Sequence, residues 1–447
     1  MFNSRFQLLF LAVLLLFLPS RGMAEGTRGI WWWTSPGHPW GVDQVLGNPT
    51  REAEAIGFFK AWKFGKVYCS FSPQTLANPG VIRAWNSKLH AAGISSQLLL
   101  SENTWIYPQH RANLLTAHIK PKLIDFNAAA GPAERYDALH LDIEPHGFPE
   151  WPTLTPLERK NLLLLLRDTF QEVRAFMNQN GAAGIPVYAD LPVWYDQVPN
   201  PVGWDSVAER DAWFQALGQS LAGISMMAYD RKTAAGIENG VSWELQNFAG
   251  ETRVALEASV GEGKTWASFE SLLAMMQTQE QIQPLRRDLD IHDFIQFHDL
   301  PLPVETWRYA NFGNISGEGP VTGNLADPDH DELPNLIEYA FAMNPNSASR
   351  ERLPVGSLTT IKGKDYPTLT FTRPTSATDL NYKVLVSTDA QEWQDACTCS
   401  GTAIAMNSGT VLISRTTSNA METIVIRVAN PIQSGQSRFF KVRVVIP

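Results

Sequence analysis

Short apolar runs alternate with longer amphipathic stretches from residue 28 to about residue 310. The apolar runs predict eight strands, at 28–33, 65–70, 94–100, 138–144, 186–191, 222–229, 253–258 and 293–298. Helical patterns separate most of them. The clearest are 51–62 and 157–178, the second of which follows Thr155-Pro156, an N-cap and a proline at the first helical position. Eight strand–helix units in about 285 residues indicate a (β/α)8 TIM barrel, a fold of the α/β class. An open, doubly wound sheet is the alternative, but no glycine-rich phosphate loop follows the first strand.

The pattern changes beyond the barrel. Residues 313–326 are rich in Gly, Asn and Ser, which is typical of a linker. Residues 366–447 alternate apolar and polar positions between short turns, which predicts a small all-β sandwich. The expected domains are a signal peptide at 1–24, the barrel at 25–312, a linker with a calcium-binding loop at 313–350 and the sandwich at 351–447.

The N-terminus has the features of a secretory signal peptide. Arg5 gives a positive start, residues 8–18 form an apolar run too short to span a bilayer, and Gly22-Met23-Ala24 supplies small residues for cleavage after Ala24. A short membrane anchor is the alternative. The mature protein is therefore predicted to be secreted, periplasmic or held at the cell surface.

Composition limits the classes of molecule that the protein is expected to bind. The chain of 447 residues has a net charge of −9 and no cluster of Lys and Arg, so nucleic acid and anionic membranes are poor partners. The mature chain has no stretch apolar enough for a transmembrane segment, and three cysteines predict no disulfide framework. Fifteen tryptophans favour carbohydrate, because aromatic rings stack on the apolar face of a sugar. Trp31, Trp33 and Trp307 are candidate platforms, with ordinary core packing as the alternative.

The most informative polar positions lie in 137–145, Asp-Ala-Leu-His-Leu-Asp-Ile-Glu-Pro. Strand alternation places His140, Asp142 and Glu144 on one face. Three polar side chains are costly to bury without partners, so this face is expected to line a cleft at the carboxyl end of the barrel. Further candidates for substrate binding, also predicted to point inwards from strands, are Tyr188, Asp190, Gln296 and His298.

Two motifs resemble glycoside hydrolase family 18, the chitinase-like barrels. Residues 137–144 are similar to the family's fourth-strand signature, Asp-Gly-x-Asp-x-Asp-x-Glu: Asp137, Asp142 and Glu144 match, whereas Ala138 stands for Gly and His140 for the middle Asp. Residues 226–230, Met-Met-Ala-Tyr-Asp, are similar to the family's Met-x-Tyr-Asp at the end of the sixth strand.

The resemblance implies roles for four catalytic residues. Glu144 would be the acid that protonates the leaving oxygen, and Asp142 would orient the substrate's 2-acetamido group, which attacks in place of an enzyme nucleophile. Tyr229 would hydrogen-bond the acetamido oxygen, and Asp230 would complete the site if the strand ends or twists there. The implied activity is retaining hydrolysis of β-linked glycans that contain N-acetylglucosamine, with no catalytic cofactor.

Other assignments of these residues, and other functions, stay open. Glu257, at the end of the predicted seventh strand, could be the nucleophile of a retaining glycosidase in which Glu144 is the acid, with the two carboxyl groups about 5–5.5 Å apart; otherwise it would bind sugar hydroxyls. His140 could instead mark a barrel that binds glycan without turnover, and the two acids could form a buried structural pair. A scaffold protein whose working part is the sandwich is a further alternative.

An acidic segment follows the linker. Oxygen ligands fall at the spacing of an EF-hand-type loop, namely Asp327, Asp329, Asp331, the carbonyl of Leu333, Asn335 and Glu338. One departure is Glu332, where such loops normally have glycine for a sharp turn. The segment resembles the calcium-binding stretches of thrombospondin type 3 and dockerin repeats, which implies a structural Ca²⁺. A solvated acidic turn before a helix at 335–342 is the alternative.

Overall fold

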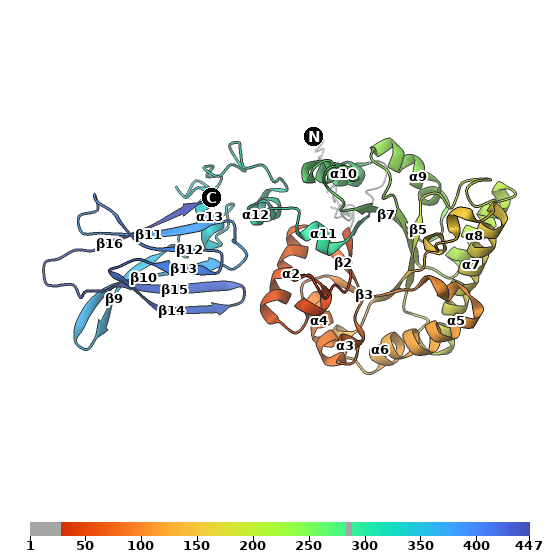
Figure 1. The fold of residues 1–447 in the computed structure, drawn as a ribbon, viewed down its shortest axis with the longest axis horizontal. Coiled ribbons are helices and arrows are strands. Elements are labelled where there is room, and N and C mark those ends of the chain that lie inside the picture. Colours follow the sequence, from red (N-terminus) through yellow and green to blue (C-terminus); the bar gives the residue numbers. More distant parts are fainter. Residues whose placement is uncertain (1–27, 283–287) are drawn as a thin grey trace, which may run out of the picture.

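The computed structural model describes residues 28–282 and 288–447, and the predicted signal peptide lies outside them. Eight parallel strands close into a barrel in sequence order, which confirms the predicted α/β fold (Figure 1). The barrel strands are β1 (Arg28–Trp32), β2 (Phe64–Cys69), β3 (Ser95–Ser101), β4 (Ala138–Asp142), β5 (Val187–Pro192), β6 (Gly223–Met227), β7 (Glu251–Glu257) and β8 (Leu289–His292).

Helices surround the barrel (Figure 1). They are α1 (Val42–Val45), α2 (Pro49–Ala61), α3 (Pro73–Leu76), α4 (Pro79–Ala91), α5 (Pro108–Asn113), a π-helical segment (Leu114–Asp125), α6 (Phe126–Ala128), α7 (Pro156–Gln179), α8 (Val207–Gly218), α9 (Ala234–Asn247), α10 (Phe269–Gln281), α11 (Phe294–His298) and α12 (Pro303–Phe312). The N-cap predicted at Thr155 is present, and it forms a capping box, because Thr155 accepts the amide of Glu158 and Glu158 accepts that of Thr155. The main core lies between these helices and the outer faces of the strands.

The predicted eighth strand, 293–298, is wrong. The barrel closes through β8, whose Asp290 is fully buried, and residues 294–298 form helix α11. Phe294 and Phe297 are buried at helical spacing, and Asp293 caps the helix by accepting the amide of Gln296. The aromatic run suggested a strand, but its burial period is that of a helix.

Charged residues form a paired layer inside the barrel below the carboxyl end. Arg253 on β7 donates to Asp290 on β8 at 2.8 Å, and Asp290 also accepts from the hydroxyls of Tyr68 and Ser225 at 2.7 and 2.5 Å. Gly29 leaves room for this network, since a Cβ there would lie 2.1 Å from the Tyr68 hydroxyl. These hydrogen bonds hold the polar side chains of the layer in place below the residues at the end of the fourth strand.

The C-terminal part is a two-sheet antiparallel sandwich, as predicted. One sheet has the order β14–β15–β10–β9 and the other β13–β12–β11–β16. The strands are β9 (Val355–Ile361), β10 (Lys364–Pro374), β11 (Asn381–Ser387), β12 (Gln394–Ser400), β13 (Ala403–Met406), β14 (Thr410–Ser418), β15 (Met421–Val428) and β16 (Phe439–Val445). Helix α13 (Asn335–Phe341) packs into the sandwich core.

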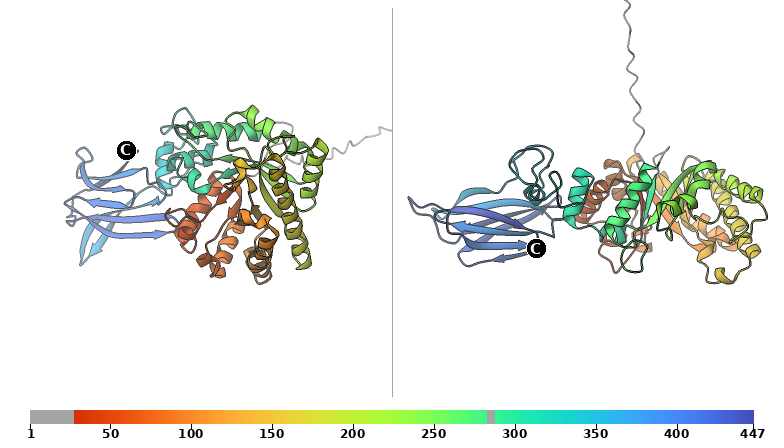
Figure 2. Two further views of the ribbon diagram at one scale, coloured as in Figure 1. Left: turned by 45° about the vertical axis from the view of Figure 1, so that its right-hand side comes forward. Right: turned by 90° about the horizontal axis from the view of Figure 1, so that it is seen from above.

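Helix α12 lies between the barrel and the sandwich (Figures 1 and 2). Its Tyr309 stacks on Trp62 of the barrel at 4.3 Å, whereas Val304 belongs to the sandwich core. A second link joins Thr375 of the sandwich to Glu54 on α2 by a 2.7 Å hydrogen bond. The two domains therefore share one helix rather than meeting only through a linker.

The cysteines and the helices bear on two predictions made from composition. All three cysteines are buried as free thiols. Within residues 28–282 and 288–447, no helix combines the length and the apolarity that a membrane crossing would need.

Candidate active site

A cavity of about 330 Å³ opens at the carboxyl ends of the barrel strands. The side chains that line it come from strands β1, β4, β5, β6 and β8 or the loops after them: Trp31, Asp142, Glu144, His146, Asp190, Pro192, Trp194, Met227, Tyr229, Asp230 and His292. The catalytic ends of parallel barrels lie on this face. All four predicted catalytic residues therefore meet in one cavity.

Strand β4 and the turn after it position the two acids. Leu139 and Leu141 anchor the strand in the outer core, so Asp142 faces the barrel interior. The strand ends at Asp142, two residues earlier than predicted. The amide of Glu144 then donates to Oδ1 of Asn103 at 2.7 Å, which holds the turn in place. Both carboxyl groups thus reach the same cavity from adjacent levels.

Asp142 has few hydrogen-bond partners. Ser101 donates to its Oδ2 at 3.3 Å, and its buried Oδ1 has no partner among the described residues. Burial, followed by the nearby charge of Asp190, raises the pKa of Asp142 to about 7. Burial, followed by the charge of Asp142, raises the pKa of Glu144 to about 8. Glu144 therefore retains a proton at neutral pH, as a general acid requires.

His140 and Asp190 lie deeper in the barrel and contact each other. Nε2 of His140 is 2.7 Å from Oδ1 of Asp190, and Nδ1 of His140 is 3.2 Å from Oε1 of Gln97. Trp31 donates its indole N–H to Oδ2 of Asp190 at 3.2 Å. Burial lowers the pKa of His140 to about 4. Of these predicted substrate-binding residues, Trp31 and Asp190 reach the cavity and His140 supports it from below.

The chain after β6 contributes Tyr229 and Asp230. Tyr229 packs 5.4 Å from the ring of His292, and burial raises its pKa well above the usual value. Asp230 is mostly exposed and lies 3.5 Å from Nε of Arg231. Strand β6 ends at Met227, so Tyr229 and Asp230 need not point to opposite faces as neighbours in a strand do. Both line the cavity.

Several lining residues were missed by the sequence analysis. His146 lies 3.9 Å from Oε1 of Glu144, and burial lowers its pKa to about 4, so the ring is neutral. Trp194 forms a wall after β5 and packs 5.3 Å from the His146 ring. His292 was missed because the eighth strand was misplaced. The positions of His146 and Trp194, directly after a predicted strand end, were the available signal.

Four predicted binding residues lie elsewhere. Gln296 is exposed on α11, and His298 packs on Trp40 at 4.1 Å, because the predicted strand is a helix. Tyr188 lies one level below Asp190, with Nζ of Lys66 5.3 Å from its ring centre. Trp307 packs on Tyr339 at 5.5 Å, at the junction with the sandwich.

Two further candidates lie beside the cavity without lining it. Glu257, at the end of β7, accepts from the Thr265 hydroxyl at 3.3 Å. Trp33 donates its indole N–H to Nε2 of His292 at 3.2 Å. Asp142, Asp190 and Asp230 therefore line the cavity together with Glu144, whereas Glu257 does not, and the charge of Asp142 acts on Glu144.

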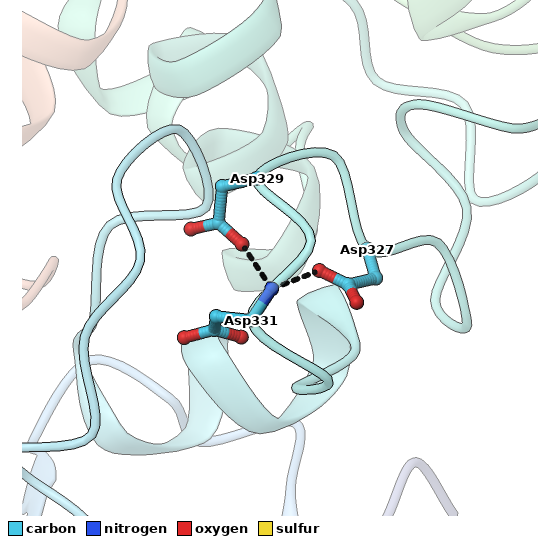
Figure 3. A group of neighbouring side chains, drawn as sticks. All are labelled: Asp327, Asp329 and Asp331. Atoms are coloured by element: carbon cyan, nitrogen blue, oxygen red, sulfur yellow. Dashed lines mark hydrogen bonds between the residues drawn. The ribbon is translucent and has the colours of Figure 1, made fainter.

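The acidic loop forms a separate cluster (Figure 3). One carboxylate oxygen from each of Asp327, Asp329 and Asp331 lies within 4.8 Å of the others. Glu338 on α13 is 1% exposed, and neither of its carboxylate oxygens has a partner among the described residues. Burial, followed by the charges of the three aspartates, raises the pKa of Glu338 to about 7.

The two other predicted ligands flank this cluster. Asn335 donates its amide group to the carbonyls of Val321 and Gly323 at 2.8 and 2.9 Å, which leaves its buried Oδ1 without a partner among the described residues. The Leu333 amide donates to Oδ1 of Asp331 at 2.8 Å, which curls the loop. Glu332 makes the sharp turn with a φ of 72°, so the glycine usual there is not needed.

Comparison with known proteins gives structural likeness only. No model of a protein family matches the sequence, and no curated protein is similar to it. A family GH18 chitinase from Chromobacterium violaceum is 12% identical, with 62% of this chain and 80% of that chain covered and a TM-score of 0.37. The β-1,4-mannanase of the sea hare Aplysia kurodai is 10% identical, with 63% and 91% covered and a TM-score of 0.40. The spore cortex-lytic enzyme SleL of Bacillus megaterium is 10% identical, with 62% and 74% covered and a TM-score of 0.36. These scores are too low to bear on function.

Proposed function

We propose that this protein hydrolyses β-linked glycans containing N-acetylglucosamine, with retention of configuration and participation of the substrate's own acetamido group. The observation that carries the proposal is the pair Glu144 and Asp142 in one half-enclosed cavity, with pKa values of about 8 and 7. Glu144 in its acid form donates a proton to the glycosidic oxygen. Asp142, once ionised, accepts the acetamido N–H and stabilises the positive charge that develops on the sugar.

The rest of the cavity suits an amide-bearing sugar. Tyr229 has a hydroxyl group with which to hydrogen-bond the acetamido oxygen, and Trp31 and Trp194 offer apolar surfaces for a pyranose ring. A nucleophile on the enzyme is not required when the acetamido oxygen attacks the anomeric carbon. The proposed mechanism therefore gives Glu257 no role as a nucleophile; its carboxylate accepts a hydrogen bond from Thr265 beside the cavity.

The test is release of reducing ends from β-1,4-linked N-acetylglucosamine oligomers. Glu144→Gln is expected to lower kcat by about 10²–10⁴-fold while leaving oligomer binding intact. Glu150→Gln, in the same loop and exposed, is the matched control and should retain full activity. Glucose oligomers of the same linkage should resist cleavage because they lack the acetamido group. Binding of the oligomers without turnover by the wild type would instead identify a glycan-binding barrel.

We also propose that the acidic loop holds one structural Ca²⁺. The buried, unpartnered carboxyl group of Glu338 and the cluster of three aspartates support this, because a bound cation would compensate their negative charges and give Glu338 a partner. Asp327, Asp329, Asp331 and Glu338 would supply carboxylate oxygens, with Asn335 and the Leu333 carbonyl as the remaining ligands.

Calorimetric titration with CaCl2 tests this site. The wild type should bind one ion, and Glu338→Gln should weaken binding at least tenfold. Glu332→Gln is the control, because that side chain is exposed, pairs with Arg350 at 2.9 Å and is not part of the aspartate cluster. An equal affinity for Ca²⁺ in wild type and Glu338→Gln would contradict the proposed ligand set.

A further inference from the structure

A second cavity, larger than the candidate active site, lies outside the barrel wall. Its volume is about 860 Å³, against about 330 Å³ for the cavity that holds Glu144, and no described residue lines both. Its lining residues come from β3, helices α3 and α4, and the helical segment from Leu114 to Phe126, which cover one side of the barrel (Figure 1). We propose that this cavity binds an amphipathic carboxylate, that is, one carboxylate group joined to an aliphatic or aromatic body.

Most of the cavity wall is apolar. Leu98 and Leu100 belong to the main core on the outer face of β3, and both line the cavity. The loops and helices around this strand add Phe71, Leu76, Ile82 and Trp105. A cavity of several hundred cubic ångströms with an apolar wall and few polar groups has the form of a small-molecule site. A neutral glycan fits it poorly, because sugar hydroxyls would lie against carbon atoms without hydrogen-bond partners.

Arg83, near the start of α4, brings a positive charge to this wall. Its guanidinium group lies 5.5 Å from the ring centre of Phe126, and its buried Nε–H has no hydrogen-bond partner among the described residues. Arginine can only donate, so the group that completes this contact must supply an acceptor. A buried donor without an acceptor is costly, and an anionic oxygen would remove that cost.

Lys122 supplies a second positive charge to the same cavity. Its Nζ lies 2.8 Å from Nδ1 of His118. An ammonium group can only donate, so Nδ1 of His118 accepts and this ring is neutral. Burial, followed by the charge of Lys122, lowers the pKa of His118, which agrees with a neutral ring. The ammonium group therefore has a neutral acceptor and two further N–H bonds that a carboxylate could accept.

The two acidic residues that line this cavity already have other donors. Asp125 accepts from Nζ of Lys120 at 2.5 Å. Oε1 of Glu102 accepts from the amide and the hydroxyl of Thr104 at 3.0 and 2.8 Å. Both acidic residues are also exposed, whereas Nε of Arg83 is buried. The charge that remains to be compensated in the cavity wall is therefore positive.

The segment that carries Lys122 has an unusual backbone. Leu114–Asp125 forms a π-helix of 12 residues with Pro121 inside it. Such helices are rare, are mostly single turns, and are frequent at functional sites. His118, Pro121 and Lys122 all line the cavity. The rare conformation thus coincides with the cavity, which supports a binding role independently of the charges.

Calorimetric titration of the protein with decanoate at neutral pH tests the inference. The wild type should bind one decanoate, and Arg83→Gln and Lys122→Gln should each weaken binding about tenfold, because each removes a charged donor. Lys60→Gln loses the same charge at an exposed position outside the cavity and should bind like the wild type. Thermal melting by circular dichroism shows whether each variant folds. If Arg83→Gln unfolds, Lys122→Gln carries the test, since that side chain is only half-buried.

Two further comparisons separate the charge from the apolar surface. Decanol, which has the same chain without the charge, should bind about tenfold more weakly than decanoate, and acetate should not compete. Leu76→Trp fills part of the cavity and should weaken decanoate binding although both cations remain.

Three results would overturn the inference: no saturable binding of decanoate to the wild type, equal affinities in the wild type and the charge variants, or decanol bound as tightly as decanoate. None of these measurements requires hydrolysis, so the inference can fail without the proposed function, and the proposed function can fail without it.

Discussion

Asp142 and Glu144 lose their protons as a pair rather than independently. Burial is the main cause that raises the pKa of each group, and the charge that appears on Asp142 further opposes ionisation of Glu144. The state with one proton on Glu144 and none on Asp142 therefore exists over a narrow pH range. The proposed chemistry requires this state, since the acid must be protonated while the acetamido N–H needs an acceptor.

This coupling predicts a narrow bell-shaped pH profile. Below a pH of about 7, Asp142 is protonated and cannot accept the acetamido N–H, so kcat/KM should fall. Above about 8, Glu144 loses its proton, and kcat/KM should fall again. Initial rates from pH 4 to 10 on a soluble oligomer check both limbs. A plateau that extends to pH 5 would contradict an Asp142 with a raised pKa.

Trp194 gives a prediction for substrate binding. Its ring forms one wall of the cavity and of a shallow hollow with Trp151 beside it. Trp194→Ala should raise KM for an oligomer about tenfold and change kcat little, because stacking contributes to binding rather than to proton transfer. Trp393→Ala, in the sandwich near Lys441, is the control and should not alter KM. A larger fall in kcat than rise in KM would assign Trp194 to the chemical step instead.

At the scale of elements, most of the fold was predicted from hydrophobic periodicity and helix capping. The start of α7 followed from Thr155-Pro156, and the structure shows Thr155 as the N-cap. The strand β8 could not be found from the sequence, because it has four residues and its middle is a buried aspartate paired with Arg253. An apolar count misses such a strand, since its charge is compensated only by residues distant in sequence.

Dependence on partners that are distant in sequence also decides which parts of the site could be predicted. Glu144, Asp142, Tyr229 and Asp230 stand near strand ends in recognisable motifs, so their meeting in one cavity could be predicted. The link between His140 and Asp190 could not, because it depends on the register that pairs β4 with β5. Sequence therefore indicated which residues reach the site but not the hydrogen bonds that join side chains from neighbouring strands.

The cap of α7 can be tested by stability. Thr155→Ala removes the hydroxyl that accepts the Glu158 amide, and the free energy of unfolding should fall by about 1 kcal/mol. Thr278→Ala makes the same change at an exposed position within α10, where alanine is the better helix former, and should be neutral or slightly stabilising. Urea unfolding followed by circular dichroism measures both; equal losses in the two variants would show that the cap is not responsible.

At the scale of the whole molecule, α12 couples the barrel to the sandwich. Its C-terminal half packs on the barrel through Tyr309, and its N-terminal half contributes Val304 to the sandwich core. Asp379 of the sandwich joins the two, because its Oδ2 accepts the amide of Val304 at 3.0 Å and its Oδ1 accepts the Tyr339 hydroxyl at 2.6 Å. A carboxylate at a helix N-terminus is favourable, so the sandwich caps a helix that also belongs to the barrel.

Removing this cap should uncouple the two domains. Asp379→Ala leaves an unpaired amide at the start of α12 and an unpaired hydroxyl on Tyr339, at a cost of about 2 kcal/mol. Because the loss falls on the shared helix, the sandwich should melt earlier than the barrel, and differential scanning calorimetry should show two transitions further apart than in the wild type. Glu351→Ala, at an exposed position before the sandwich, should leave the trace unchanged. If Asp379→Ala instead lowers both transitions equally, α12 transmits stability across the whole molecule as one cooperative unit.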